Sequence, residues 1–261
     1  GKRVLELIDK NIYVLRDYVD FPKLDSIFLV NNDLEDDRRV DAAIIRAMKD
    51  LTFELGDIYL DKIEIVEELA SRYNIFKNID DNLKGLAKKR EIMISNEDYY
   101  LMVVYLDELN NGVSIASLMS RDVKKINKFN DLIKLTEGEL GITYNKEQKE
   151  AIKSALTNNV SIITGGPGTG KTTIIKGIIR LYSIYKKISY ETVTREVCLL
   201  APTGRASKRM SETCGIGAST IHRFLKWDKE SNTFAVNEFN KDHYNMFIIE
   251  ETSMLDNHLL S

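Results

Sequence analysis

The spacing of apolar residues changes along the chain. Between residues 37 and 55 they recur at intervals of three and four, as on one face of an α-helix, here formed by Val40, Ile44, Ala47, Met48 and Leu51. After about residue 142, short apolar runs rich in β-branched residues alternate with helical segments. The first pattern predicts a mostly α-helical region, and the second predicts an α/β region built on a parallel sheet.

The first region carries clear signals for helix ends. Gly56 is suited to end the helix over 37–55, because glycine readily adopts the left-handed conformation found after helices. The next helix is expected to begin at Asp61. Asp61 and Glu64 have the spacing of a capping box, and Leu60 with Ile65 has that of a hydrophobic staple.

A further helix is predicted over 97–110, with its end near Gly112. The basic run at 88–90 is expected to lie in an exposed loop or hairpin. An aromatic cluster in this part of the chain is expected to belong to the core or to a half-buried surface rather than to a base-stacking platform, and it consists of Tyr99, Tyr100 and Tyr105.

The second region is expected to alternate helices with strands. Helices are predicted over 145–156 and after residue 170, and strands over 160–164, 197–201 and 246–249. The second helix has a buried face formed by Ile174, Ile175, Ile178 and Ile179. Ligands of parallel sheets bind beyond the carboxyl ends of the strands, and polar residues follow all three predicted strands.

These patterns divide the chain into four segments. Residues 1–30 and 31–121 are mostly helical, 122–141 is a polar, weakly periodic stretch expected to be a linker, and 142–261 is the α/β domain. The chain begins at Gly1 and stops soon after an apolar strand, so we expect it to be part of a longer protein, cut within its α/β domain.

Composition limits the classes of function. Lys and Arg total 37, Asp and Glu total 40, and the net charge is −3, so any contact with nucleic acid must come from a local basic patch. The two cysteines are not in a CxxC pair, which argues against a zinc site or a disulfide framework and suits the cytoplasm. Cys198 is expected to be buried. No apolar run is long enough to span a membrane, so a membrane partner is not expected.

Residues 165–172 match the phosphate-binding pattern G-x-x-x-x-G-K-[ST] without a mismatch. Glycines allow successive N–H groups to point at phosphate oxygens, Lys171 supplies a charge for the β- and γ-phosphates, and the Thr172 hydroxyl can bind Mg²⁺. The predicted contacts to ATP from this loop and the start of the following helix are Gly166, Pro167, Gly168, Thr169, Gly170, Lys171, Thr172 and Thr173.

Two acids, Glu250 and Glu251, follow the apolar run at 246–249. A buried strand that ends in two carboxylates can hold both beside a bound nucleotide. Upstream of the loop, Asn145 and Gln148 have capping-box spacing, so Gln148 is expected either to close a helix end or to contact the adenine base, and both interpretations remain open.

Residues 195–229 contain seven Lys or Arg against three Asp or Glu, a local positive excess in an acidic chain. Candidate contacts to single-stranded DNA in this stretch are Pro202, Thr203, Gly204, Arg205, Thr220, His222 and Arg223. The alternatives are a solvated helix face for the basic residues and a core position for His222.

Together these segments resemble the RecD-like superfamily 1 helicases, including the conjugative relaxase-linked relatives, over roughly residues 143–256. Residues 143–148 resemble the Q motif, 199–207 motif Ia, 219–225 motif Ib and 247–256 motif II. The resemblance implies an incomplete RecA-like motor domain, an adenine contact by Gln148, and motion along DNA from 5′ to 3′.

In the family, the first acid of motif II is usually Asp and holds Mg²⁺, and the second handles the attacking water. The resemblance therefore implies that Thr172 and Glu250 hold the metal and that Lys171 and Glu251 are catalytic. Glu at position 250 is a departure, and a displaced carboxylate would slow hydrolysis.

The resemblance also reaches upstream. Residues 15–22 resemble a degenerate helix-hairpin-helix, in which Asp20 and Pro22 replace the glycines that would approach a DNA backbone. This puts direct DNA binding by segment 1–30 in doubt. The helices beyond Asp37 resemble the accessory N-terminal region of the same family.

The function that we expect for the parent protein is ATP-dependent DNA unwinding or translocation, with ATP and Mg²⁺ as cofactors and single-stranded DNA as partner. We expect the 261-residue chain to bind nucleotide, to hydrolyse it poorly and not to unwind DNA. Two alternatives are an ATP-gated nucleic-acid-binding module with slow hydrolysis and another P-loop ATPase. Partners in recombination or repair are not specified by the sequence.

Overall fold

The computed structural model describes residues 2–123, 125–228, 233–237 and 239–260. The chain divides into two compact units, residues 1–110 and 111–260, each with its own hydrophobic core. Among the described residues, no helix is both long and apolar enough to cross a membrane.

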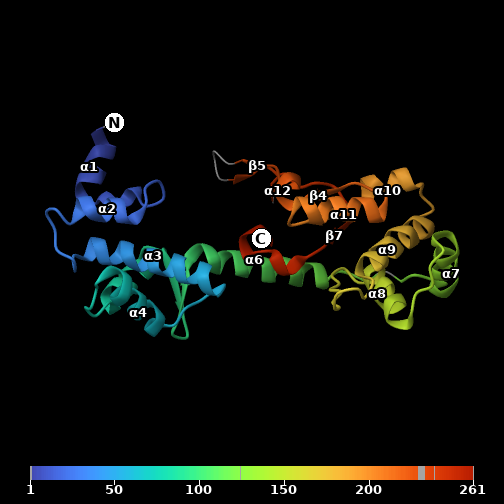
Figure 1. The fold of residues 1–261 in the computed structure, drawn as a ribbon, viewed down its shortest axis with the longest axis horizontal. Coiled ribbons are helices and arrows are strands. Elements are labelled where there is room, and N and C mark those ends of the chain that lie inside the picture. The colour runs from blue at the N-terminus through green and yellow to red at the C-terminus, as the bar shows by residue number, and fades with distance from the viewer. Residues whose placement is uncertain (1, 124, 229–232, 238, 261) are drawn as a thin grey trace. The chain divides into compact units, whose positions relative to one another are not determined.

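The first unit is mostly helical and contains one small hairpin (Figure 1). Its elements are α1 (Lys2–Lys10), η1 (Ile12–Leu15), α2 (Phe21–Phe28), α3 (Asp37–Leu55), α4 (Lys62–Tyr73), α5 (Asp80–Lys88), β1 (Ile92–Ser95), β2 (Asp98–Leu101) and the first part of α6 (Met102–Met119).

The predicted helix signals of this unit are confirmed. α3 covers the expected range, ends at Gly56 with φ of 75°, and buries Val40, Ile44, Ala47 and Met48. α4 begins with the predicted capping box, in which the Asp61 and Glu64 side chains each accept a backbone N–H from the other residue. The basic run at 88–90 is exposed, as expected, at the end of α5 and in the turn after it.

The helix predicted over 97–110 is wrong at both ends. Its first residues form β2, which pairs antiparallel with β1, and α6 continues past Gly112 to Met119. Asn96 and Glu97, with φ of 50° and 72°, form the two-residue turn between the strands. In this segment, the cross-strand pairing of β1 with β2 determines the structure, although the spacing of apolar residues is also compatible with a helix. Tyr99, Tyr100 and Tyr105 are half-buried, as one of the two expectations had it.

The second unit is an α/β domain. Its helices are α7 (Phe129–Leu140), α8 (Lys146–Thr157), α9 (Lys171–Lys186), α10 (Tyr190–Glu196), α11 (Gly204–Cys214), α12 (Ile221–Phe224), η2 (Thr252–Met254) and α13 (Asn257–Leu260). Its strands are β3 (Val197–Ala201), β4 (Ala218–Thr220), β5 (Trp227–Asp228), β6 (Thr233–Phe234) and β7 (Met246–Ile249).

A three-stranded parallel sheet, in the order β4-β3-β7, forms the centre of this unit. β3 is buried along its whole length, and its side chains alternate between two cores. Val197 and Leu199 pack with α9 and α11 on one face, whereas Cys198 and Leu200 pack with Ile221 on the other. The predicted α/β architecture with a parallel sheet, preceded by a helical region, is therefore confirmed.

Two expectations about this unit are corrected. The stretch at 122–141, expected to be a linker, contains α7, which packs against α9 because Phe129, Leu132, Ile133 and Thr136 share one face. The run at 160–164 joins no strand among the described residues, and Ile162 is 84% exposed. An apolar run forms a strand only where another strand pairs with it, and the sequence could not supply that condition.

Candidate nucleotide and nucleic-acid site

The phosphate-binding loop precedes α9, as its sequence pattern requires. Gly168 and Gly170 have φ of 74° and 84°, a conformation that L-residues rarely adopt. Gly165 is needed for space, because a Cβ atom there would lie 2.7 Å from the Thr169 hydroxyl oxygen. The Thr169 hydroxyl donates to the Gly166 carbonyl at 2.9 Å, which ties the two sides of the loop together.

The Lys171 ammonium group folds back over this loop. It donates to the carbonyl oxygens of Gly165 at 2.6 Å and of Gly166 at 2.9 Å. The loop thus holds a full positive charge at its centre, on the first residue of α9, where the positive end of the helix dipole adds to it. This arrangement favours a polyanion.

Strand β7 brings Glu250 to the same loop. The Glu250 backbone N–H donates to the Leu200 carbonyl at 3.0 Å, which extends the β3–β7 pairing by one residue. The Thr172 hydroxyl donates to Glu250 Oε1 at 3.1 Å. The two residues predicted to hold a metal are therefore neighbours, and their oxygen atoms are the ligand type that Mg²⁺ prefers.

Glu251 has an unusual backbone. Its φ of 56° and ψ of 41° are left-handed, and it stands at the N-terminus of η2. A side chain in this conformation is destabilising by about 1–2 kcal/mol, and such residues cluster at functional sites. The side chain is exposed, and in the described part of the chain its carboxylate has no hydrogen-bond or ion-pair partner. It is thus adjacent to Glu250 but not joined to Lys171.

Gln148 contacts both α8 and the loop. Its Oε1 accepts the Asn145 N–H at 3.1 Å, so the capping box is present, and its Nε2 donates to the Thr169 carbonyl at 3.3 Å. A Cβ atom on Gly170 would approach that Nε2 to 2.9 Å. The amide therefore lies against the phosphate-binding loop, and the adenine contact stays a prediction.

Tyr144 was not singled out from the sequence. Its hydroxyl donates to the carbonyl of Thr173, in the first turn of α9, at 3.2 Å. Gly177 allows this approach, because a Cβ atom there would lie 2.6 Å from the tyrosine oxygen. Burial, with a smaller effect from the negative Glu137, raises the pKa of Tyr144 to about 12. A glycine inside an apolar helix is the sequence signal that could have indicated this contact.

The predicted DNA-contacting segments meet at the carboxyl edge of the sheet. Thr203 follows β3 and caps α11, and Thr220 ends β4 and caps α12. Because β3 and β4 are parallel neighbours, with Ala201 opposite Thr220, both caps lie at one edge. Gly204 and Arg205 are exposed in the first turn of α11, and Pro202 is half-buried.

His222 and Arg223 are exposed on α12, so the core interpretation of His222 is wrong. The His222 ring lies 6.4 Å from that of Trp227 and 6.3 Å from that of Phe234, measured between centroids. Sequence reasoning missed these two half-buried rings, because they belong to the short pair β5–β6, which has no clear pattern.

Comparison with known proteins agrees with this geometry. Residues 148–261 match the AAA domain family. The ATP-dependent RecD2 DNA helicase of Deinococcus radiodurans is 34% identical over 115 residues, which cover 44% of this chain and 15% of the relative. The RecD subunit of the RecBCD enzyme of Mycobacterium tuberculosis is 32% identical over 125 residues, or 42% of this chain and 21% of the relative. These matches support the interpretation of the α/β region as part of a RecD-like superfamily 1 helicase.

The RecD-like region is not the whole extent of similarity. An uncharacterized protein of Methanocaldococcus jannaschii, MJ1519, is 30% identical over 220 residues, covering 78% of this chain and 17% of that protein. The aligned part of this chain is longer than the whole second unit, so the similarity extends into the helical first unit. The chain spans only 15% to 21% of the length of these three relatives.

Proposed function

We propose that this chain forms the nucleotide-binding part of an ATP-dependent DNA helicase or translocase, and that it binds ATP with Mg²⁺ and single-stranded DNA. The observation that carries the proposal is the hydrogen bond of 3.1 Å between the Thr172 hydroxyl and the Glu250 carboxylate. It joins the phosphate-binding loop to the acid at the end of β7, two segments that lie 78 positions apart in sequence.

The proposal assigns roles to the phosphate-binding loop, to the two acids after β7 and to Gln148. The loop N–H groups and Lys171 neutralise the charge of the triphosphate, and Thr172 with Glu250 would hold Mg²⁺. Bound Mg²⁺ would supply charge neutralisation at the β- and γ-phosphates. Glu251 orients, and accepts a proton from, the water that attacks the γ-phosphate. Gln148 contacts the adenine from the start of α8.

For DNA, the proposal assigns the strand to the two capped helix starts beyond β3 and β4. Thr203 and Thr220, with the exposed side chains of Arg205, His222 and Arg223, would contact the phosphates. Movement from 5′ to 3′, which the motif resemblance implies, is part of the same proposal. So is a cytoplasmic location, which suits the two free cysteines.

A second candidate function rests on Glu250. The longer side chain at the position that is usually Asp already contacts Thr172 directly, so a metal would have to share or displace that contact. If it does so poorly, the protein is an ATP-gated nucleic-acid-binding module with slow hydrolysis.

The test measures nucleotide and DNA binding by the full chain. Mg²⁺ should strengthen ATP binding, and Glu250→Gln should remove that strengthening, a loss of about tenfold or more, because it removes the metal-binding charge. Lys171→Ala should weaken binding with or without Mg²⁺. If Glu250→Gln leaves the Mg²⁺ dependence intact, the metal assignment is wrong.

DNA binding is checked with the same samples. Retention of a single-stranded oligothymidylate on filters should fall in Arg223→Ala. It should stay unchanged in Arg121→Ala, the control, because Arg121 is an exposed arginine outside the basic stretch at 195–229. No retention by the unmodified chain would favour a P-loop ATPase of another class over a helicase.

A further inference from the structure

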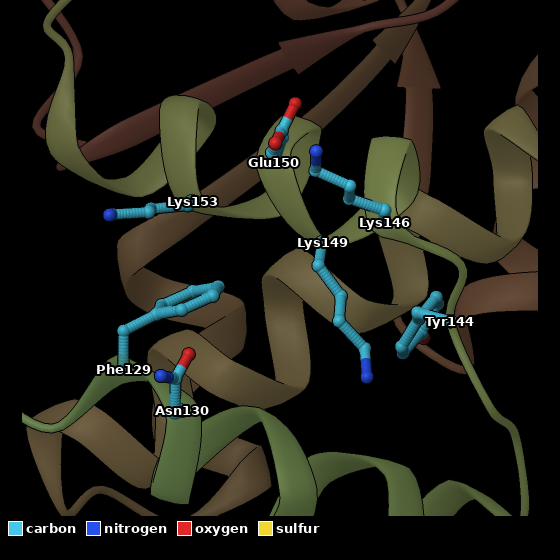
Figure 2. Close-up of a pocket in the computed structure, with 7 residues that line it drawn as sticks. All are labelled: Phe129, Asn130, Tyr144, Lys146, Lys149, Glu150 and Lys153. Carbon is cyan, nitrogen blue, oxygen red and sulfur yellow. The ribbon is translucent and has the colours of Figure 1, made fainter.

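A pocket of about 410 Å³ lies between α7 and α8 in the second unit. Phe129 and Asn130, the first residues of α7, form one side of it, and α8 contributes Lys146, Lys149, Glu150 and Lys153 (Figure 2). Small-molecule sites in proteins usually have volumes of about 300–1,000 Å³. The pocket is therefore large enough for a small ligand, and the proposed function gives these six residues no role.

The α8 side of the pocket is positively charged. Its four residues follow the spacing i, i+3, i+4 and i+7, so they share one helix face, with three ammonium groups against one carboxylate. Within the described residues, neither Lys146 nor Lys153 forms an ion pair. Only Lys149 is paired, to Glu137 at 2.9 Å. In a chain of net charge −3, the two unpaired ammonium groups beside the single Glu150 carboxylate leave a local positive excess, which favours an anionic ligand.

The α7 side contributes an aromatic ring. Phe129 is half-buried, and the Lys153 ammonium lies 5.8 Å from the centre of its ring. Figure 2 shows the Lys149 side chain extending from α8 towards α7, with Phe129 and Asn130 on one side and Tyr144 on the other. An aromatic ring beside ammonium groups is the combination with which proteins hold a base and its phosphate.

The pocket is separate from the proposed ATP site. Gln148 points from α8 to the Thr169 carbonyl of the phosphate-binding loop, whereas Lys149 points to Glu137 of α7. The two sites are nevertheless connected through Tyr144, which lines the pocket and donates to the Thr173 carbonyl in the first turn of α9. A ligand in the pocket would thus touch a side chain that is fixed to the start of the loop's own helix.

We propose that this pocket binds a nucleotide unit as a second ligand, with its phosphate held by Lys146, Lys149 and Lys153 and its base against Phe129. The unit comes either from a free nucleotide or from the end of a nucleic-acid strand, since both present the same base and phosphate.

The test is an NMR titration of the ¹⁵N-labelled full chain with thymidine 5′-monophosphate, with and without saturating ADP and Mg²⁺. Signals of residues 129–153 should shift in both conditions, so the result does not depend on the proposed ATP site. The double variant Lys146→Glu/Lys153→Glu should weaken binding about tenfold or more, because it replaces two attractive charges with repulsive ones. Phe129→Leu should weaken it severalfold, and ADP binding measured alone reports separately on the ATP site.

Lys88→Glu is the matched control, because Lys88 is an exposed lysine at the end of α5 in the first unit, and it should change nothing. Tighter binding of the dinucleotide pTpT at the same residues identifies a strand end, and binding of the mononucleotide alone identifies a free nucleotide. The proposal is overturned if no signals in 129–153 shift or if Phe129→Leu has no effect. It also fails if inorganic phosphate or an oligoglutamate peptide binds as tightly as the nucleotide.

Discussion

Arg39 is a buried cation that organises the first unit. Its side chain is 3% exposed, and its guanidinium group donates to both carboxylate oxygens of Asp25, at 2.8 and 3.0 Å. The same group donates to the carbonyls of Leu34 at 2.7 Å and Tyr73 at 3.0 Å. Tyr13 also donates to Asp25, and burial, followed by that hydrogen bond, raises the pKa of the tyrosine. One ion pair therefore joins η1, α2, α3 and the end of α4.

Replacing Arg39 with Met should destabilise the first unit by about 3–5 kcal/mol, because it leaves the Asp25 charge without its partner in a largely buried position. Arg46→Met is the control on the same helix: its ion pair with Asp50 is exposed, and its loss should cost at most about 1 kcal/mol. Urea unfolding followed by circular dichroism measures both. Equal losses in the two variants would show that burial of the pair contributes nothing.

Single residues differ in how well the sequence specified them. The neighbouring positions of Thr172 and Glu250 could be predicted, because a P-loop and an acid after a parallel strand meet at one sheet edge. The network around Arg39 could not, because its partners are distant in sequence and no local pattern marks a buried charge. The left-handed backbone of Glu251 depends on the chain around it and was equally invisible.

At the scale of elements, the close contact of α9 with Tyr144 fixes the helix that follows the phosphate-binding loop. Gly177 is buried, and an added Cβ atom would lie 2.6 Å from the Tyr144 oxygen and 2.8 Å from Ile152 Cδ1. Tyr144 is itself 2% exposed and held by its bond to Thr173, so it has little room to move. The helix can therefore approach α8 only because this position lacks a side chain.

Gly177→Ala should destabilise the second unit by about 1–3 kcal/mol, because the overpacked contact outweighs the gain of about 1 kcal/mol from helix propensity. It should also weaken nucleotide binding, since α9 begins at Lys171. Gly138→Ala is the control within α7, where nothing lies within 4 Å of the added atom, and it should stabilise by about 0.5–1 kcal/mol. Thermal unfolding measures the stability change in each variant, and ATP binding is measured in parallel. If both variants are more stable than the unmodified chain, the close contact at Gly177 is contradicted.

Elements with strong local signals were predicted well, and those that depend on partners were not. α3, α4, α8 and α9 have regular apolar spacing, caps or both, and β3 and β7 are apolar runs that find a neighbour. The run at 160–164 is also rich in apolar β-branched residues but has no partner strand in the described part of the chain. The β1–β2 hairpin was missed because its two strands are only four residues long.

At the scale of the whole molecule, the two units have separate cores and differ in how many of their described carboxyls have a lowered pKa. In the first unit, hydrogen bonds from Arg38, Lys77 and Lys62 lower the pKa values of three carboxyls, which belong respectively to Asp36, Asp37 and Asp80. In the second unit, the hydrogen bond from Lys149 lowers the pKa of Glu137. A carboxyl whose pKa is lowered in the folded state stabilises that state when the pH is above the carboxyl's unfolded-state pKa. This contribution is lost as the pH falls through the folded-state pKa.

Acid should therefore weaken the first unit more than the second. The single tryptophan, Trp227, lies in the second unit, so its fluorescence follows that unit while far-ultraviolet circular dichroism follows both. Between about pH 7 and about pH 3.5, the urea midpoint seen by circular dichroism should fall further than the midpoint seen by fluorescence. Parallel shifts of the two midpoints would contradict this expectation.

One amide group in the second unit has to satisfy two neighbours at once. Gln148 accepts a hydrogen bond from the Asn145 N–H, at the start of α8, and donates one to the carbonyl of Thr169 in the phosphate-binding loop. A ligand group that accepts a hydrogen bond from the Gln148 Nε2 competes with the Thr169 carbonyl. If the side chain rotates to reach that ligand, its Oε1 no longer accepts the Asn145 N–H. Loosening of the loop is therefore expected to accompany partial fraying at the start of α8, and hydrogen exchange should rise at both places together.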